Sequence, residues 1–376
     1  MLYFDYAATT PVDPEVLEEM LPWMNEAFYN ASSLYMGGRK ARVAVEEARN
    51  RTAVFLDARP EEIIFTSGGT EADNTAVIGG ALAAEKRGRK RVVVSSVEHH
   101  AVLESCRFLE STGFQVTRLP VNRYGVVEPE ALRSAMGGDV GLVSVMWVNN
   151  ELGTVQDIPA LSRIAHEFGA VFHTDAVQAV STQPVSFKDC KADLLSISGH
   201  KIYGPKGCGA LAVREGTAFM PLLHGGQQER GLRGGTENVP AIVGLGKAAQ
   251  LMAGRRESDR IVMEQKKRRM AERLVGADIR LNSPLEYTAP SILNVAFRGV
   301  EAEGMLFHLS RQGFCVSMGS ACNSSSVEPS HVIRAIGLPE DFRRGCIRVS
   351  FGHGQTEEDC DALAEQLLAL SGRLKS

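Results

Sequence analysis

The stretch that governs the interpretation of this chain is Ser196-Ile197-Ser198-Gly199-His200-Lys201-Ile202-Tyr203-Gly204-Pro205-Lys206-Gly207. An apolar run leads into small residues, then one lysine, then a Gly/Pro turn. A lysine at the end of a strand and between glycines holds its amine in a tight, backbone-lined place. Desolvation or a nearby cation there lowers the amine pKa and allows Schiff-base formation. Taken alone, a solvated surface lysine is the commoner meaning of such a stretch, so the rest of the chain must decide.

Outward from this stretch, short apolar strands alternate with helices. Strands are expected at 62–66, 91–95, 115–119, 140–148, 171–175, 194–198 and 209–213, and helices at 14–27, 36–56, 71–87, 100–112, 128–136 and 159–168. Strands that are apolar along their whole length and separated by helices are typical of a mostly parallel sheet with both faces covered. The sequence therefore predicts an α/β fold.

The last part of the chain has a different pattern. A long helix is expected at about 240–274, interrupted near the Gly/Arg run 254–256, after a glycine-rich loop at 224–240. The remainder, which ends in a helix at 357–370, favours a smaller α+β domain. We expect a large domain over 15–260 and a small domain that combines 1–14 with 261–376.

Composition excludes several classes of protein. The chain has 376 residues, 44% hydrophobic and 23% charged, with a net charge of −4, typical of a globular protein large enough for two domains. The basic cluster 266–269 is interpreted as a solvated helix face, so no nucleic-acid partner is predicted. No apolar run reaches membrane-spanning length and no signal-peptide pattern is present, so we expect a cytoplasmic protein without membrane contact.

Seven cysteines are scattered along the chain without C-x-x-C spacing. Their odd number and spacing argue against a disulfide framework and against a structural zinc site. In a reducing compartment most of them are expected to be buried small hydrophobes, and one can be reactive.

Polar clusters follow the predicted strands at their carboxyl ends. They are Ser67–Thr70, His99, Asn150, Asp175 with Gln178, and His200 with Lys201. Because ligands of parallel sheets collect at the carboxyl ends of the strands, we expect these clusters to share one edge of one sheet.

Each cluster has a plainer alternative. The turn 67–70 suits a phosphate at a helix N-terminus but is also an ordinary capping turn. His99 could belong to a metal pair with His100, lie in the core, or stack on a flat cofactor. Asp175 follows an apolar strand, where a carboxylate needs a partner such as a protonated ring nitrogen, although it could equally cap the next helix.

Together these residues carry a resemblance. The motifs lie at 66–71, 98–101, 148–151, 174–178 and 198–207. With them, the chain resembles the cysteine desulfurases of the NifS/IscS type, pyridoxal-phosphate enzymes of the class V aminotransferase group. The resemblance runs from Asp5 to Ser350 and implies a fold-type I enzyme with a seven-stranded, mostly parallel sheet in its large domain.

The resemblance also implies how pyridoxal phosphate is held. Lys201 would carry it as a Schiff base, Asp175 would pair with the ring nitrogen, and His99, also expected to be catalytic, would stack on the ring. Gln178 and Asn150 would contact the side of the ring hydroxyl. The residues implied at the phosphate are Gly69, Thr70, Ser198, His200 and, in a homodimer, Thr236 of the partner subunit.

On the substrate side, Arg348 would clamp the carboxylate of L-cysteine, with Asn30 and Asn150 nearby. Cys322 lies in a small, polar stretch, 317–331, where an accessible thiolate could form. The resemblance implies that Cys322 takes the substrate sulfur as a persulfide and releases L-alanine. The sulfur would pass to an iron–sulfur scaffold protein or a thiolation acceptor. No metal site is predicted, and contact of Cys322 with an iron–sulfur fragment stays open.

Two other functions are compatible with these residues. One is selenocysteine lyase or another class V reaction on the same fold, and the other is a non-catalytic relative kept as a scaffold. The chain also departs from the family: Leu34 and Tyr35 stand where a histidine is common, Ala31 replaces a proline, and the chain ends soon after 357–370. The identity of the sulfur acceptor therefore stays open.

Overall fold

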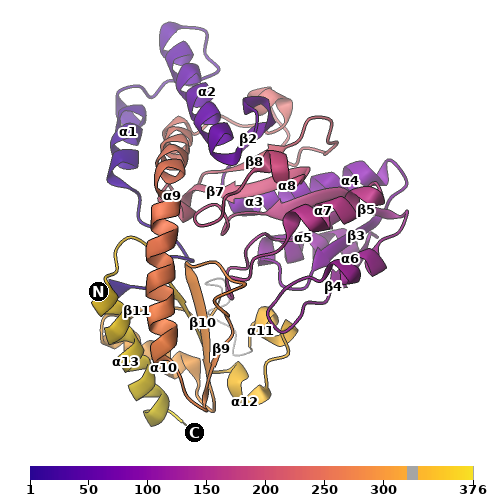
Figure 1. Ribbon diagram of the computed structural model, residues 1–376. Helices are drawn as coiled ribbons and strands as arrows, with labels where there is room; N and C mark the ends of the chain where they lie inside the picture. Colours follow the sequence, from indigo (N-terminus) through magenta and orange to yellow (C-terminus); the bar gives the residue numbers. More distant parts are fainter. Residues whose placement is uncertain (320–328, 376) are drawn as a thin grey trace.

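The computed structural model describes residues 1–319 and 329–375. Figure 1 shows a large part built around a central sheet and a smaller part below it, joined by one long helix. Within the described residues, no helix is both long enough and apolar enough to cross a membrane.

The central sheet has seven strands in the order β2-β8-β7-β6-β5-β3-β4. Their bounds are β2 (Ile63–Thr66), β3 (Arg91–Ser95), β4 (Gln115–Leu119), β5 (Val140–Ser144), β6 (Val171–Asp175), β7 (Leu194–Ser198) and β8 (Gly209–Val213). The strands from β7 to β4 run parallel, and β8 pairs antiparallel with both β7 and β2. The predicted α/β class and mostly parallel seven-stranded sheet are confirmed.

Alternating side chains of the strands supply two apolar layers. In β3, Val92 and Val94 pack into one buried cluster and Val93 into another, as the two-residue period of a strand requires. The first layer is covered by α3 (Gly69–Asn74), a π-helical segment (Thr75–Gly79), α4 (Gly80–Glu85) and α5 (His100–Ser111).

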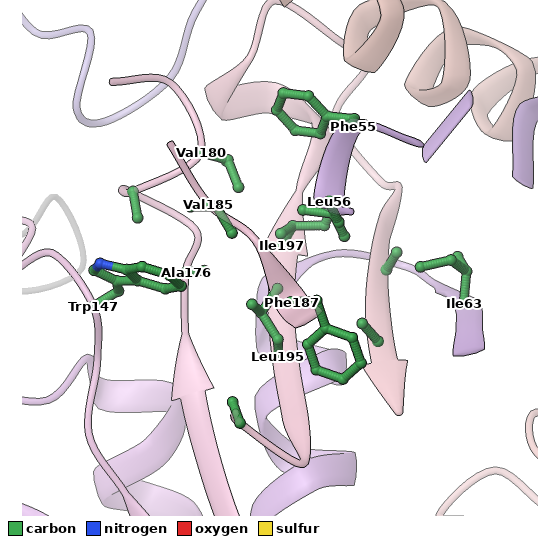
Figure 2. Close-up of a cluster of buried hydrophobic side chains, with 14 of the residues drawn as sticks. Phe55, Leu56, Ile63, Trp147, Ala176, Val180, Val185, Phe187, Leu195 and Ile197 are labelled. Atoms are coloured by element: carbon green, nitrogen blue, oxygen red, sulfur yellow. The ribbon is translucent and has the colours of Figure 1, made fainter. Parts of the chain in front are cut away.

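The opposite layer contains larger side chains and more helices. It is covered by α1 (Pro14–Asn25), α2 (Met36–Leu56), α6 (Pro129–Ala135), α7 (Ile158–Glu167), α8 (Phe187–Cys190) and part of α9 (Val239–Arg273). Figure 2 shows part of this layer, with Leu195 and Ile197 of β7 near Phe187 and Leu56. Burial on both faces explains why the strands read as continuous apolar runs.

One predicted strand is too long. The apolar run 140–148 predicted a strand to its end, but β5 ends at Ser144. Its last pair with β3 is Val94–Ser144, since β3 itself ends at Ser95. Beyond that point the chain keeps backbone hydrogen bonds toward β6, from Val145 N–H to His173 and from Trp147 N–H to Asp175, and Val148 forms an isolated bridge with Val155. The run is buried as expected, so apolarity indicated burial correctly and strand length wrongly.

The smaller part has its own sheet and its own core. Its strands are β9 (Ile279–Leu281), β10 (Ile292–Phe297) and β12 (Cys346–Ser350), antiparallel in the order β12-β10-β9, while β1 (Leu2–Tyr3) pairs parallel with β11 (Phe314–Cys315). Its helices are α10 (Ala302–Arg311), α11 (His331–Ala335), α12 (Glu340–Arg343) and α13 (Glu357–Arg373). Phe4 is fully buried in this core. The domain limits at 15–260 and 261–376 remain a prediction, which the separate core supports.

The long helix α9 connects the two parts (Figure 1) and is continuous over 35 residues. The predicted interruption at 254–256 is therefore wrong. Gly254 faces open space, so the missing side chain costs the helix only about 1 kcal/mol. Arg255 offsets this cost because it pairs with Asp13 at 2.8 Å and lies over the ring of Tyr203.

Two close contacts hold the outer helices and loops against the large sheet. A Cβ atom at Gly246 of α9 would lie only 2.6 Å from Ala48 Cα of α2, so the two helices meet where a side chain is missing. Arg49 of α2 forms a buried bidentate pair with Glu229, at 2.7 and 2.8 Å. Glu229 belongs to the 3₁₀ turn Gln228–Gly231, so the pair fastens the loop before α9 to the sheet edge.

Candidate active site

A pocket of about 210 Å³ lies at the carboxyl ends of the parallel strands. It is lined by residues that are far apart in the sequence: Ala7, Ala8, Gly69, Thr70, Asp73, His99, Met146, Asn150, Asp175, Val177, Gln178, Ser198, His200, Lys201 and Arg348. Most of the predicted site residues therefore meet in one place, as the position of the strand ends led us to expect.

Lys201 reaches the pocket from the 3₁₀ turn Gly199–Lys201 that directly follows β7. Its Nζ donates hydrogen bonds to the carbonyl oxygens of Ala8, at 2.8 Å, and Ala7. Thr10 N–H and Thr10 Oγ1 both donate to the carbonyl of His200, each at 3.0 Å. The N-terminal segment thus covers the lysine, and the amine sits among backbone carbonyls.

Asp175 is the last residue of β6 and is 4% exposed. Its Oδ1 accepts a hydrogen bond from Val177 N–H at 2.8 Å. Burial raises the pKa of Asp175 to about 6, while the Val177 bond and the charge of Lys201 lower it. The ionised form of a buried carboxyl with a raised pKa is stabilised by a cationic or N–H partner in the pocket.

Two histidines line the pocket as neutral rings. His99 is the N-cap of α5, where its Nδ1 accepts from Ala101 N–H at 3.1 Å. Burial, then the charge of Lys201, lowers the pKa of His99 to about 4. Burial likewise lowers the pKa of His200 to about 4, and its Nδ1 hydrogen-bonds with Thr9 Oγ1 at 3.1 Å. Neutral, flat rings can stack on a flat ligand at no charge cost.

One end of the pocket is made of small residues at the start of α3. Gly68 has a φ of 150°, and a Cβ at Gly69 would lie 2.9 Å from Val177 Cγ2. The turn is braced by Glu71, which accepts from Ser67 N–H at 2.8 Å and pairs with Arg233 at 2.9 Å. Exposed backbone N–H groups in such a turn are suited to phosphate oxygens.

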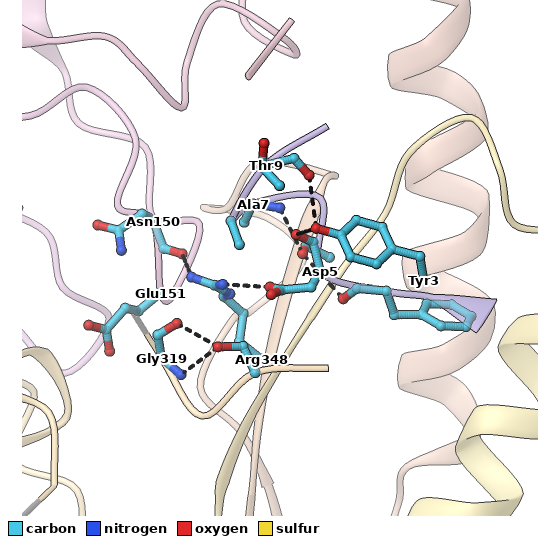
Figure 3. Close-up of polar contacts among 12 residues, drawn as sticks. Tyr3, Asp5, Ala7, Thr9, Asn150, Glu151, Gly319 and Arg348 are labelled. Atoms are coloured by element: carbon cyan, nitrogen blue, oxygen red, sulfur yellow. Dashed lines mark hydrogen bonds and ion pairs between the residues drawn. The ribbon is translucent and has the colours of Figure 1, made fainter. Parts of the chain in front are cut away.

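Arg348 forms the opposite end and comes from β12 of the smaller sheet (Figure 3). It is 1% exposed and donates to Asp5 Oδ1 at 2.7 Å and to the carbonyl of Asn150 at 2.9 Å. Its Nε is buried without a partner among the described residues. The guanidinium is therefore held in place from two sides and still has donors to offer a ligand carboxylate.

Two predicted site residues lie elsewhere. Asn30 is exposed between α1 and α2, where its Oδ1 accepts from Ser32 N–H at 2.8 Å. Thr236 is exposed in the loop before α9. Neither lines the pocket of its own chain. The expected role of Thr236 concerns a second subunit and stays a prediction. Leu34 and Tyr35 are 79% and 59% exposed.

Cys322 lies outside the described residues; the chain on either side of the undescribed segment contacts Arg348, which lines the pocket, and the two residues that flank His99. On one side, Ser317 and Arg348 exchange backbone hydrogen bonds of 3.1 and 2.6 Å. On the other, His331 Nε2 donates to the carbonyl of Glu98 at 2.9 Å, and its ring lies 4.9 Å from that of His100.

Five of the six described cysteines are poor nucleophiles. These five are buried: Cys106, Cys190, Cys208, Cys346 and Cys360. Burial raises the pKa of each of these five thiols, to between about 11 and about 12. Cys315 is half-buried.

Sequence reasoning missed several pocket residues. The carbonyls of Ala7 and Ala8 had no signal, because any residue type carries a backbone carbonyl. Asp5, which contacts Arg348 beside the pocket, had a signal only as the first residue of the stretch that shows the family resemblance. Asp73 had a usable signal, since it lies one helical turn after Thr70 on the face that is otherwise apolar.

These residues fit pyridoxal phosphate. The pocket offers an amine for the aldehyde, a buried carboxyl that needs an N–H partner, a neutral ring for stacking, and N–H donors at a glycine turn. A pocket of this composition at the carboxyl edge of such a sheet defines a fold-type I pyridoxal-phosphate enzyme.

Comparison with known proteins places the chain more closely. Residues 2–363 match the family described as Aminotransferase class-V. The chain is 47% identical over 379 residues to the cysteine desulfurase IscS of Dictyoglomus turgidum, covering 100% of this chain and 95% of that protein. It is also 47% identical over 376 residues to IscS of Methanosarcina thermophila, covering 100% and 93%.

Solved structures agree with this placement. A NifS-like protein superposes with a TM-score of 0.93 at 35% identity, covering 99% of this chain and 100% of that one. SspA in complex with cysteine superposes with a TM-score of 0.84 at 38% identity, covering 94% and 99%. The chain belongs to the class V aminotransferase family, among its cysteine desulfurases of the NifS/IscS type, and the resemblance is confirmed.

Proposed function

We propose that this protein is a pyridoxal-phosphate-dependent cysteine desulfurase that converts L-cysteine to L-alanine and carries the sulfur as a persulfide on Cys322. The observation that carries the proposal is the meeting of Lys201, Asp175 and Arg348 in one pocket, beside both ends of the segment that contains Cys322. The names of the similar proteins support it.

The residues that would hold the cofactor divide by position in the pocket. All five line the pocket: Lys201 would bind it covalently, Asp175 would pair with the ring nitrogen, His99 would stack on the ring, and Asn150 and Gln178 would contact the side of the ring hydroxyl. The phosphate contacts come from Gly69, Thr70, Ser198, His200 and Thr236 of the partner subunit. When bound, pyridoxal phosphate supplies an electron sink for the substrate Cα.

The chain's own residues then act on the substrate. Arg348 would bind the substrate carboxylate with a pair of N–H groups, beside Asn150, whose carbonyl holds the guanidinium. Lys201 Nζ would take the Cα proton of the substrate as general base. The Cys322 thiolate attacks the substrate sulfur: an S–S bond forms, the C–S bond breaks, and the carbon keeps the electron pair and gains a proton to become the methyl group of alanine.

The partners follow from this chemistry. A persulfide is useful only if another protein accepts its sulfur, so we propose an iron–sulfur scaffold protein or a thiolation acceptor as partner. We also propose that the protein is cytoplasmic and forms a homodimer. The homodimer is supported because Thr236 is exposed and does not line the pocket of its own chain, so it is available to a second subunit.

The test measures alanine formed from L-cysteine in the presence of dithiothreitol. Wild type should form alanine, Cys322→Ala should keep the bound-cofactor colour but form none, and Lys201→Ala should lose both. Cys315→Ala is the matched control, because Cys315 is half-buried and is expected to retain turnover. Turnover at the wild-type rate in Cys322→Ala would refute the nucleophile. A coloured wild type that forms no alanine would point to another class V reaction.

A further inference from the structure

A buried carboxyl in the pocket wall has no role in the chemistry above. Asp73 of α3 lines the pocket, its side chain is 2% exposed, and its Oδ1 has no hydrogen-bond partner among the described residues. That oxygen lies 3.6 Å from His173 Nε2. A buried carboxyl oxygen that has no hydrogen-bond partner and belongs to the wall of a ligand pocket requires a chemical reason.

The side chains around Asp73 carry hydroxyls and a neutral ring. His173 is fully buried, with Nε2 3.0 Å from Ser196 Oγ and Nδ1 2.8 Å from Ser144 Oγ. Burial lowers the pKa of His173 to about 3, so its imidazole adds no positive charge. These neighbours can orient Asp73 by hydrogen bonds, but they cannot neutralise an ionised carboxylate.

The charge that acts most strongly on Asp73 is the negative charge of Asp175, at the end of β6. Glu98, between β3 and α5, is a buried carboxyl whose own pKa burial raises to about 8, so it is neutral at about pH 7. Burial and the Asp175 charge raise the pKa of Asp73 well above its ordinary value. Two neighbouring buried carboxyl groups cannot both ionise without a cation between them, so one of the two keeps a proton.

The contacts indicate which one keeps it. Asp175 has a backbone N–H bond of 2.8 Å and feels the charge of Lys201, and both favour its ionised form. Asp73 Oδ1 has no such donor among the described residues, and burial and the negative charge of Asp175 both favour its neutral form. The ionised form therefore belongs to Asp175 and the neutral acid to Asp73.

We propose that Asp73 is a positioning residue of this site: it stays a neutral carboxylic acid, so that Asp175 is the single ionised carboxylate that faces the ring nitrogen of the cofactor. The inference rests on the proposed function, because it assigns Asp175 to that nitrogen. Asp73 also lies 3.6 Å from His173 of β6, which in turn hydrogen-bonds with Ser196 of β7.

Infrared spectroscopy of the holoenzyme tests the protonation directly. A protonated carboxylic acid has a carbonyl band at higher frequency than amides or ionised carboxylates. At about pH 7 the wild type should show such a band that is lost in Asp73→Asn. Glu98→Gln is the matched control, because Glu98 is an equally buried carboxyl that does not line the pocket. It should remove only its own band, so persistence of every acid band in Asp73→Asn would overturn the proposal.

The pH dependence of the cofactor colour gives a second readout. If Asp73 is neutral, Asp73→Asn replaces one neutral group by another, and the midpoint of the colour change stays at the wild-type pH. If Asp73 is ionised, its removal takes a negative charge from the pocket, and the midpoint falls by about 1 pH unit, which would overturn the proposal. Glu98→Gln should leave the midpoint in place.

The two proposals can fail separately. If wild type forms no alanine but the acid band and the midpoint behave as expected, the role of Asp73 holds for another reaction on the same cofactor. If wild type forms alanine while Asp73→Asn keeps every acid band or lowers the midpoint, the desulfurase activity holds and the role of Asp73 is wrong.

Discussion

The orientation of Arg348 makes a quantitative prediction for Arg348→Lys. Arginine has five N–H donors, and two are engaged by Asp5 and the carbonyl of Asn150, which leaves three for the substrate carboxylate. A lysine in the same place has three donors, and the same two acceptors would leave one. The substrate then loses one charge-assisted hydrogen bond, worth about 1.5–3 kcal/mol. This loss corresponds to a fall in kcat/KM of about 10- to 150-fold.

The assay is steady-state alanine formation at varied L-cysteine concentration. Because the carboxylate contact exists both before and during the reaction, the fall should appear mainly as a higher KM. Arg344→Lys is the control: Arg344 is 58% exposed and pairs with Glu301 at 3.2 Å, a surface contact worth about 0–1 kcal/mol. A kcat/KM for Arg348→Lys within about threefold of wild type would refute the assignment of the substrate carboxylate to Arg348.

Three further predictions concern stability. Gly246→Ala should lower the free energy of unfolding, measured by urea titration, by about 1–3 kcal/mol because its Cβ has no room. Gly254→Ala in the same helix should raise it by about 0.5–1 kcal/mol, and equal effects would contradict the packing argument. Arg49→Met should cost about 3–5 kcal/mol by leaving Glu229 buried without its cation, and a second change, Glu229→Leu, should recover much of the loss in the same urea titration. Burial raises the pKa of Glu98 to about 8, above its unfolded value of about 4.3. The wild type therefore loses stability as pH rises between these values, whereas Glu98→Gln does not. The melting temperature of the wild type should fall relative to that of Glu98→Gln from about pH 5 to about pH 8, and a constant difference would count against this.

Much of the large sheet could be predicted because its strands are buried on both faces. The bounds of β3, β6, β7 and β8 follow from largely apolar runs that end at or before a polar or glycine residue. The same reasoning failed beyond Ser144, since an apolar run shows that residues are buried but not whether a neighbouring strand is still present to pair with them.

The pocket was predictable only where side-chain chemistry carried the signal. Lys201, Asp175 and His99 stand at strand ends, where residue type and position together indicate a ligand. The two backbone carbonyls above the lysine could not be found, since their position depends on how the N-terminal segment folds over β7. The continuity of α9 through Gly254 is supported by the ion pair between Arg255 and Asp13. Because these two residues are far apart in the sequence, a local pattern cannot predict their contact.

The N-terminal segment has a consequence for how the protein is made. Asp5 holds an arginine that lies 343 positions further along the chain, and Ala7 holds a lysine 194 positions further along. The Asp5 contact cannot form during synthesis until residue 348 has left the ribosome, and closing a loop of this length is entropically costly. The large sheet and the cover over its lysine can form earlier, but the pocket lacks its arginine until then. A nascent chain would therefore lack the means to release sulfur from cysteine until both parts of the protein are complete.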